Sequence, residues 1–392
     1  MFITILFSAC SQDPIFSYYQ EENGKVFDEK YSLQVVDSVR MPLSNEATFW
    51  QYSSHFTETS HQKTFYSFLN TNNNTIEYHQ VDEMGDIPAV VPLEVDGENG
   101  VGKLNYVCAH LFLNPDSIFI YNINTAKLFL VDTTGTVKRK YTIKDYYADK
   151  NTPSPRPSDL GPIQKLGNAL YFSCSLYKFP GDLHSNHQVV LTFDLVSEKT
   201  NYIFPFPKSY DQGFWGSPFK YICSLEKGPQ VDRYFVSFPI DPYIYESDLN
   251  GRVLNKYYIG SKYFDEIPAL YSNADYGLKK NRDFEKEDIY SLSTPDFVKL
   301  IYDKYRNVYY RLTYLRPDKD EVKKGNSTPD FTIIICNTDF QKVGEVFFDG
   351  EKYNNSMISV ARQGLAIARK DLYKRNDDYI SYNFFDLVSI ES

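Results

Sequence analysis

The chain has 392 residues, of which 51 are acidic and 41 basic, so its net charge is −10 at neutral pH. The 42% hydrophobic content is ample for a core, and 34 Tyr and 29 Phe, against four Met and two Trp, favour β-strands over helices. Basic residues cluster only in short pairs such as Lys279–Lys280, so the sequence lacks the basic stripe with which nucleic-acid-binding proteins displace counterions.

The chain opens with an apolar run, MFITILFSA (residues 1–9), which is too short to span a bilayer because a span needs about 20 residues. Small residues precede Cys10 and a polar stretch follows it, so this segment resembles the lipobox of bacterial lipoproteins, in which the cysteine becomes the acylated first residue. We therefore predict a signal segment at residues 1–9, lipidation at Cys10 and a polar tether over residues 10–30. The alternative is that residues 2–9 form a buried edge strand with Cys10 in the core.

Residues 31–43, YSLQVVDSVRMPL, alternate like a β-strand but have no neighbouring partner strand. After them one unit recurs: an alternating strand, a tight turn centred on Asp or Asn with Gly or Lys, and a second alternating strand. Each copy is predicted to be a hairpin, because its turn residues tolerate positive φ or bond their own backbone. The five copies span residues 76–93, 128–143, 189–206, 243–260 and 331–348.

Two further strand candidates precede every hairpin, so each unit holds four strands, which is the blade of a β-propeller. A sixth unit at the C-terminus supplies only three strands, the last being YISYNFFDL (residues 379–387). Pairing that strand with residues 31–43 closes the ring and removes two open sheet edges. We predict an all-β fold with one six-bladed β-propeller of four-stranded antiparallel blades over residues 31–392. The alternative is two packed β-sandwiches.

Long connections gather on one face of this predicted propeller. In a blade with strands a to d, the a–b and c–d turns share one face and the b–c and d–a connections share the other. The long connections, residues 144–162, 179–187, 207–217, 261–296, 316–330 and 370–378, are all of the second kind. Because binding residues gather on loops held by a rigid scaffold, we predict a ligand-binding funnel on this face. Its candidate lining residues are Arg156, His184, His187, Tyr210, Trp215 and Arg316.

Motifs for catalysis or metal binding are weak. His184 and His187 have a spacing seen in some metal sites, but no third ligand is close in sequence, so we expect no metal and no cofactor. Glycoside hydrolysis needs a carboxylate pair. The sequence marks no such pair among the available candidates Asp145, Asp159, Asp241 and Glu246. The other cysteines lie within apolar runs, and we expect buried free thiols at Cys108, Cys174, Cys223 and Cys336.

The lipobox-like FSAC, the polar tether, the strand YSLQVVDSVRMPL and the degenerate, aromatic-rich blades together resemble a family of uncharacterised six-bladed β-propeller lipoproteins of Gram-negative gut anaerobes. The resemblance spans nearly the whole chain. It implies a propeller fold and a place in the cell envelope, as an outer-membrane lipoprotein on the periplasmic or the surface side. It carries over no catalytic residue.

Two functions remain open. The favoured one is a lipid-anchored binding or scaffolding module whose funnel engages a glycan, a peptide or an envelope protein. We expect such a module to be a monomer that contacts the membrane only through its lipid anchor. The alternative is a hydrolase or lyase that acts on polysaccharide in the same funnel. Two or three carboxylates within roughly 5 to 9.5 Å of one another at the funnel floor would favour the enzyme.

Overall fold

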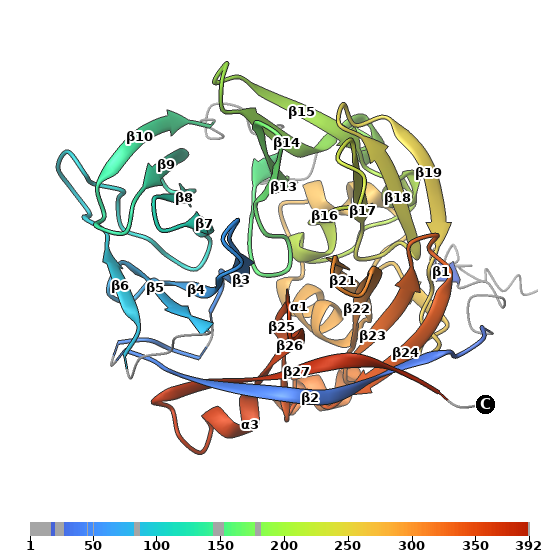
Figure 1. Cartoon of the computed structure of the whole chain (residues 1–392). Helices are drawn as coiled ribbons and strands as arrows, with labels where there is room; N and C mark the ends of the chain where they lie inside the picture. The colour runs from blue at the N-terminus through green and yellow to red at the C-terminus, as the bar shows by residue number, and fades with distance from the viewer. Residues whose placement is uncertain are drawn as a thin grey trace, which may run out of the picture.

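Six antiparallel β-sheets lie radially around a central axis, and together they form a disc (Figure 1). The computed structural model describes residues 17–19, 27–44, 46–49, 51–81, 87–143, 153–176 and 182–390. In each of blades 1 to 5 the main strands follow one another along the chain, from strand a at the axis to strand d at the rim. The predicted all-β six-bladed propeller is therefore confirmed, and the alternative of two packed sandwiches is excluded.

The blades are built from the following strands. Blade 1 holds β3 (Ser54–Glu58), β4 (Thr64–Asn70), β5 (Thr75–Gln80) and β6 (Ala89–Pro92). Blade 2 holds β7 (Ala109–Asn114), β8 (Ser117–Asn122), β9 (Lys127–Val131) and β10 (Val137–Thr142). Blade 3 holds β12 (Gln164–Leu166), β13 (Ala169–Ser175), β14 (Gln188–Asp194) and β15 (Thr200–Pro205), with the short β11 (Ser154–Pro155) beside β13.

Blade 4 holds β16 (Ser224–Lys227), β17 (Arg233–Ser237), β18 (Tyr243–Asp248) and β19 (Val253–Tyr258). Blade 5 holds β21 (Asp296–Asp303), β22 (Val308–Leu315), β23 (Asp330–Asn337) and β24 (Lys342–Phe348). Blade 6 holds β25 (Tyr353–Ala361), β26 (Gly364–Arg369), β27 (Tyr379–Ser389) and β2 (Tyr31–Pro42).

The outer strand of blade 6 comes from the beginning of the chain. Strand β2 pairs antiparallel with β27 from Tyr31 opposite Ser389 to Pro42 opposite Tyr379, and Figure 1 shows the two running side by side. A bulge between Val35 and Asp37 shifts the register by one residue. The pairing expected for residues 31–43 is thus present, and it covers the edge that β27 would otherwise expose.

Local turn chemistry forms the outer hairpins. Asp132 accepts the backbone N–H of Thr134 at 2.9 Å, and Gly135 follows with a φ of +82°, which a glycine adopts without steric cost. In three other hairpin turns, the side-chain oxygens of Asp194, Asp248 and Asn337 likewise accept a backbone N–H two or three residues further along. The predicted turn near Asp82 lies outside the described residues.

Aromatic side chains fill the wedges between blades. Between blades 4 and 5, the ring of Tyr309 lies 4.4 Å from Phe340 and 5.2 Å from Phe235. Between blades 6 and 1, the Tyr382 hydroxyl donates to Tyr66 at 3.0 Å. Each buried aromatic side chain contributes roughly 1.5–3 kcal/mol of hydrophobic stabilisation, which explains why a propeller consumes so many Tyr and Phe. The four cysteines of the described chain are buried and free, as expected: Cys108, Cys174, Cys223 and Cys336.

Short helices lie in the b–c and d–a connections, which form what we call the loop face; the a–b and c–d turns form the opposite turn face. The α-helices there are α1 (Phe284–Ser293), α2 (Lys319–Lys323) and α3 (Lys370–Tyr373). The 3-10 helices there are η3 (His184–Asn186), η4 (Lys208–Asp211), η5 (Pro218–Tyr221) and η6 (Ala274–Leu278).

Part of the expected N-terminal tether is docked on the propeller. Strand β1 (Ser17–Tyr19) pairs with β20 (Glu266–Pro268) in the connection between blades 4 and 5. The Lys30 backbone N–H donates to the Val343 oxygen, and the Lys30 oxygen accepts the backbone N–H of Ile390. A short strand in a loop leaves N–H and C=O groups unpaired, and the N-terminal segment satisfies them. Polar composition alone did not predict this docking. Residues 1–9 and Cys10 lie outside the described residues.

Candidate functional site

Three of the predicted funnel residues are buried beneath the loop face. The His184 ring stacks 5.0 Å from Tyr221, and Tyr210 donates its hydroxyl to the backbone oxygen of Lys220 at 2.7 Å. Trp215 lies 6.4 Å from Tyr210 and is fully buried. These side chains therefore support the loops from below instead of lining an open surface. Sequence reasoning placed them correctly in the connections but could not see that their apolar rings pack inwards.

Burial governs the charge of His184. Transfer of the imidazolium from water into this aromatic cluster is unfavourable, so burial lowers the pKa of His184 to about 4. At neutral pH the ring is uncharged, which suits its stacking on Tyr221. The side chain acts here as an aromatic group whose protonation would destabilise the cluster.

Arg316 belongs to a charged cluster at the base of the same loops. Its guanidinium contacts both carboxylate oxygens of Asp296 at 3.3 Å and covers the ring of Tyr314 at 4.7 Å. Lys220 reaches the same carboxylate at 2.9 Å and donates to the backbone oxygen of Thr294 at 2.8 Å. Burial lowers the pKa of Lys220 to about 8, although Asp296 opposes the shift. The cluster ties η5 to the start of β21 and the end of β22.

The remaining two predicted residues are less enclosed. His187 Nε2 lies 2.6 Å from the Asp182 carboxylate, which is itself exposed. Arg156 is half-buried, and its backbone N–H donates to Ser173 at 2.8 Å. The structure brings His184, Tyr210 and Trp215 into one cluster and links it through Lys220 to Arg316. Ligand binding by any of the six residues stays a prediction.

Residues 158–161 occupy the axis of the propeller. The Asp159 backbone N–H donates to the backbone oxygen of Tyr52 at 3.0 Å, and its carboxylate accepts the Ser54 hydroxyl at 3.2 Å. Ser54 begins the innermost strand of blade 1, and Tyr52 lies just before it. Leu160 packs against the hydrophobic core of blades 5 and 6. At Gly161 the backbone passes so close to blade 3 that a Cβ would lie 3.1 Å from Ser173 Oγ. One short segment that touches blades 1, 3, 5 and 6 must fill the centre, so the predicted funnel is closed at its floor.

Charged and polar groups surround residues 158–161, which we call the plug. Burial raises the pKa of both Asp159 and Glu226 to about 7, and the nearby Lys299 ammonium partly offsets the shift at each carboxyl. Lys299 donates to the backbone oxygen of Ile358 at 2.7 Å, and burial lowers its pKa. The group is enclosed, since Asp159 and Glu226 are 5% and 9% exposed. Lys299 thus interacts electrostatically with both carboxyls, and we call these buried groups, together with the histidines described next, the axial network.

Two histidines complete the axial network. His55 and His110 stack with their ring centroids 4.5 Å apart, and His110 contacts the hydroxyls of Ser53 and Ser67 at 2.9 Å each. Burial lowers the pKa of His55 to about 4 and holds the pKa of His110 well below its usual range. Both rings are therefore neutral at pH 7. Sequence reasoning missed this network. A partial signal was His110 on β7 and Lys299 on β21, where each is a polar residue within a largely apolar innermost strand.

The other carboxylates considered for glycoside chemistry have structural partners. Asp241 is buried and accepts the Tyr245 hydroxyl at 2.7 Å. Glu246 lies on β18, where it pairs with Arg233 at 3.4 Å. Asp145 lies outside the described residues. Asp159 is thus the one of these candidates that the described structure places at the axis.

Exposed aromatic side chains of the connections lie on the loop face. Tyr52 and Tyr106 are 51% and 62% exposed, and their ring centroids are 5.7 Å apart. Further exposed rings on these connections are Phe219, Tyr263 and Phe284. On the described turn face, by contrast, the exposed large apolar side chains are all aliphatic: Ile87, Val196, Val231 and Leu249. Among 34 tyrosines the sequence held no signal that singled out Tyr52 and Tyr106.

Comparison with known proteins then identifies the family. The model of a domain of unknown function, DUF4221, matches residues 26–346. The chain belongs to the DUF4221 family. A crystal structure of a DUF4221 member from Bacteroides vulgatus ATCC 8482 is similar over 93% of this chain and 100% of that one, with a TM-score of 0.77 and 19% identity. A putative exported protein from Bacteroides fragilis NCTC 9343 is similar over 93% and 99%, with a TM-score of 0.53 and 10% identity. A comparison with curated proteins gave no match.

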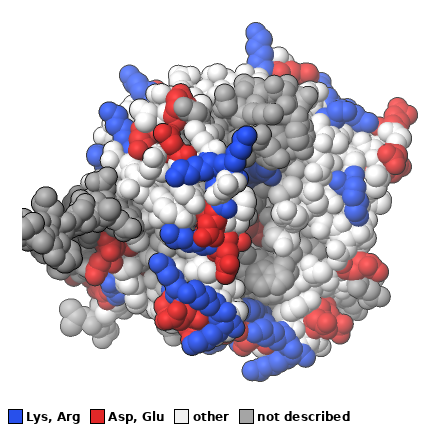
Figure 2. All heavy atoms as spheres, turned by 180° about the vertical axis from the view of Figure 1, so that it is seen from behind, with Lys and Arg blue, Asp and Glu red and all other residues white. Residues whose placement is uncertain are grey.

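These likenesses show the propeller fold of this DUF4221 chain, and its surface chemistry must be read from its own residues. Seen from behind the view of Figure 1, basic side chains are interleaved with acidic ones (Figure 2). In the part of the chain that the structure describes, no group of three His, Cys, Asp or Glu residues is placed to hold a metal ion. No described helix has the length and apolar character of a membrane span.

Proposed function

We propose that this DUF4221 protein is a lipid-anchored binding or scaffolding module of the cell envelope whose loop face engages a macromolecular partner, namely a glycan, a peptide or an envelope protein. The observation that carries the proposal is that, among the residues that the structure describes, the exposed aromatic side chains of the connections all lie on the loop face. Aromatic side chains offer a large contact area at small entropic cost and dominate recognition surfaces. An anchor at Cys10 would hold the propeller at the outer membrane as a monomer.

Rigidity supports this role. The Tyr52–Tyr106 pair stands beside the plugged axis, because Tyr52 accepts the backbone N–H of Asp159 at 3.0 Å. Elsewhere on the same face, the loops of blade 3 and those between blades 3 and 4 rest on the buried cluster of His184, Tyr210 and Trp215. A surface that is already ordered loses little conformational entropy when it binds. A closed axis also suits a partner that spreads over the face better than a small molecule in a deep funnel.

The rival function, a polysaccharide hydrolase or lyase, has one observation in its favour: Asp159 and Glu226 both have a pKa of about 7 next to Lys299. Acid–base catalysis requires such tuned groups, but it also requires that they touch the substrate. Both carboxyls are almost completely enclosed. Binding without turnover is therefore the better account.

The test is incubation of the mature protein with a panel of envelope and dietary polysaccharides, with thermal shift and release of reducing ends measured on the same samples. We expect a shift without product, and we expect the Tyr52→Ala/Tyr106→Ala double variant to lose it. Tyr31→Ala, which removes an exposed tyrosine from the rim of blade 6, is the matched control and should behave as wild type. Product release would establish the rival function. If no polysaccharide shifts the protein, the glycan arm of the proposal is wrong and the partner must be a peptide or protein.

A further inference from the structure

The described parts of the N-terminal segment are docked at the boundary of blades 4 and 5. Strand β1 pairs with β20 in the connection between these blades. Further along the segment, Glu29 forms an ion pair with Lys262 of the same connection, and the Lys30 backbone N–H donates to Val343 of β24 at 2.9 Å. Figure 1 shows β1 at the outer edge of the disc, on the side of blades 4 and 5. The segment is thus held at one side of the ring from Ser17 onwards.

This docking shortens the tether that a lipid anchor would have. Only six residues separate Cys10 from Ser17. Because an extended chain rises by at most about 3.6 Å per residue, an anchor at Cys10 reaches at most about 25 Å from β1. A compact chain of this length has a radius of gyration of roughly 21 Å, so its opposite rim lies roughly 50 Å away. An anchored propeller would therefore keep the boundary of blades 4 and 5 close to the bilayer.

Two exposed aromatic side chains lie beside the docked segment. The rings of Tyr263 and Phe347 have their centroids 6.2 Å apart, and both side chains are exposed. Tyr263 follows Lys262, and Phe347 lies on β24, the strand on which Lys30 docks. We call Tyr263 and Phe347 the rim patch. Amphipathic aromatic rings favour the headgroup level of a bilayer, and the rim patch faces solvent where the tether brings the bilayer near.

The charges around the rim patch are already paired. Lys342 Nζ donates to the Glu345 carboxylate at 2.6 Å and to the backbone oxygen of Gly260 at 3.0 Å. The Lys262 ammonium pairs with Glu29, as described above. Each of these two ammonium groups therefore has a carboxylate partner. The rings, and not an excess of positive charge, are what this surface offers a membrane, so it fits uncharged or zwitterionic headgroups.

We propose that the rim patch lies in the headgroup region of the membrane and holds the propeller edge-on, with blades 4 and 5 at the bilayer. The inference rests on the lipidation of Cys10 in the proposed function, because two rings bind a bilayer weakly unless a short tether raises their effective concentration. It adds a second contact to the lipid anchor, which the sequence alone predicted to be the only contact with the membrane.

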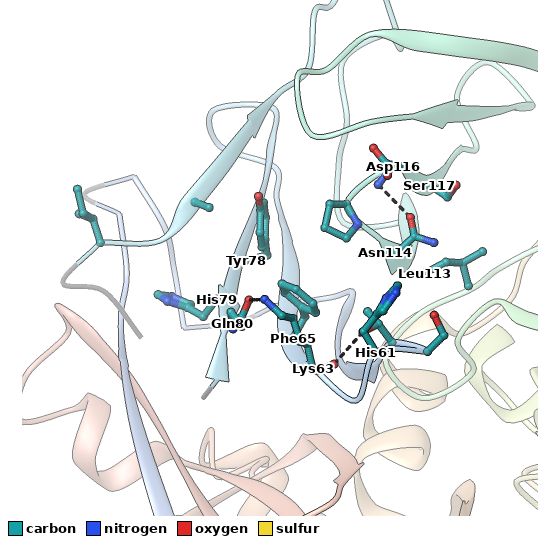
Figure 3. A pocket seen from close by; sticks show the side chains of 15 residues that line it. His61, Lys63, Phe65, Tyr78, His79, Gln80, Leu113, Asn114, Asp116 and Ser117 are labelled. Atoms are coloured by element: carbon teal, nitrogen blue, oxygen red, sulfur yellow. Dashed lines mark hydrogen bonds between the residues drawn. The ribbon is translucent and has the colours of Figure 1, made fainter. Parts of the chain in front are cut away.

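Blades 1 and 2 lie across the ring from blades 4 and 5 (Figure 1). Tyr52 and Tyr106 precede the innermost strands of these two blades on the loop face. On the turn face of the same boundary, a hollow of about 740 Å³ opens between residues 59–63 and 113–117 (Figure 3). In the edge-on orientation both surfaces are directed away from the bilayer. The partner of the loop face can therefore approach from the aqueous side.

The experiment anchors the mature chain, which begins at Cys10, to phosphatidylcholine vesicles that carry a maleimide lipid. Coupling is selective for Cys10 because the other four cysteines are buried. Phe347→Trp then places a fluorescent ring in the rim patch, and the emission of the two native Trp residues is subtracted with wild type. With lipids brominated near the headgroup end of their chains, we expect position 347 to lose about half of its emission, since interfacial rings reach this depth.

Val90→Trp is the matched control. Val90 lies on β6 at the rim of blade 1 and is 45% exposed, against 46% for Phe347 on β24. Its emission should be unchanged by the brominated lipids. Should Phe347→Trp fail to fold, Tyr263→Trp reports on the same patch. No quenching in the rim patch, or equal quenching at positions 347 and 90, would overturn the proposal.

Two further measurements separate the causes of a failure. Addition of phosphatidylglycerol to the vesicles should leave the quenching at position 347 unchanged, and quenching that requires this anionic lipid would show that basic groups make the contact, against the proposal. Mass spectrometry of the Cys10 peptide from cells tests the anchor by itself. An unacylated Cys10 would overturn the anchor of the proposed function, and with it the membrane contact in cells, even if the chemically coupled protein is quenched at position 347.

Discussion

At the scale of single residues, burial decides which groups can act. His184 and Tyr210 carry chemistry that a sequence reader associates with binding, yet their contacts are the packing contacts of a core. Conversely, Tyr52 and Tyr106 have no motif around them and are the exposed pair on the loop face. The side-chain type sets what a residue is able to do, and its exposure sets whether a partner can reach it.

The lowered pKa of His184 makes stability depend on pH. Because the folded pKa, about 4, lies below the unfolded value of 6.5, the unfolded state binds more protons, and stability is lost as pH falls below 6.5. This one group costs about 2 kcal/mol between pH 7 and pH 5. His184→Phe retains the aromatic stacking and cannot be protonated. Between pH 7 and pH 5, wild type should therefore lose about 2 kcal/mol more of its free energy of unfolding than this variant does.

Urea unfolding at pH 7 and pH 5 measures both values. His187→Gln is the control, because the His187 side chain contacts exposed Asp182 and lies outside the aromatic cluster. A His184→Phe variant that loses as much stability as wild type on acidification would show that the ring is protonated without penalty.

At the scale of elements, the hairpins were predictable because their information is local. Alternation and an Asx turn lie within 16 to 18 residues of chain. The five predicted outer hairpins correspond to β5–β6, β9–β10, β14–β15, β18–β19 and β23–β24. The pairing of β2 with β27 was predictable for another reason. The sequence contained one strand without a neighbouring partner and one blade without its outer strand, so each supplied what the other lacked. The docking of β1 on β20 had no such signal, because it depends on where the connection between blades 4 and 5 folds back.

Strand β2 should be required for a stable ring. It buries Leu33, Val39 and Met41 against blades 5, 6 and 1, and losing several such side chains removes roughly 1.5–3 kcal/mol each from a total stability of about 5–15 kcal/mol. We expect a chain lacking residues 1–43 to aggregate or to lose its cooperative thermal transition. A chain lacking only residues 1–26 should remain monomeric and cooperative.

Size-exclusion chromatography and circular dichroism melting compare the two truncations. A synthetic peptide of residues 28–43 should restore the transition of the shorter chain by adding the missing strand. A chain without residues 1–43 that melts like the longer one would mean that the ring does not depend on this closure.

At the scale of the whole molecule, the propeller divides its surface into two faces of different character. The turn face is held by short hairpins, whereas the loop face carries the helices and the exposed rings. This division followed from loop lengths in the sequence. The plug at residues 158–161 and the axial network of Asp159, Glu226, Lys299, His55 and His110 did not, because they depend on contacts between blades far apart in the chain. Blades can be predicted from local sequence patterns, whereas the residues that meet at the axis come together only when the ring closes.

The most direct measurement of the central claim, that the loop face is the recognition surface, is photo-crosslinking in cells that express the full-length protein. A benzophenone amino acid at position 106 reports on the loop face, and one at position 231, where Val231 is 89% exposed in a turn of blade 4, reports on the turn face. We predict discrete adducts from position 106 that disappear with Tyr52→Ala, and none from position 231. Adducts from position 231 alone, or equally from both positions, would contradict the account.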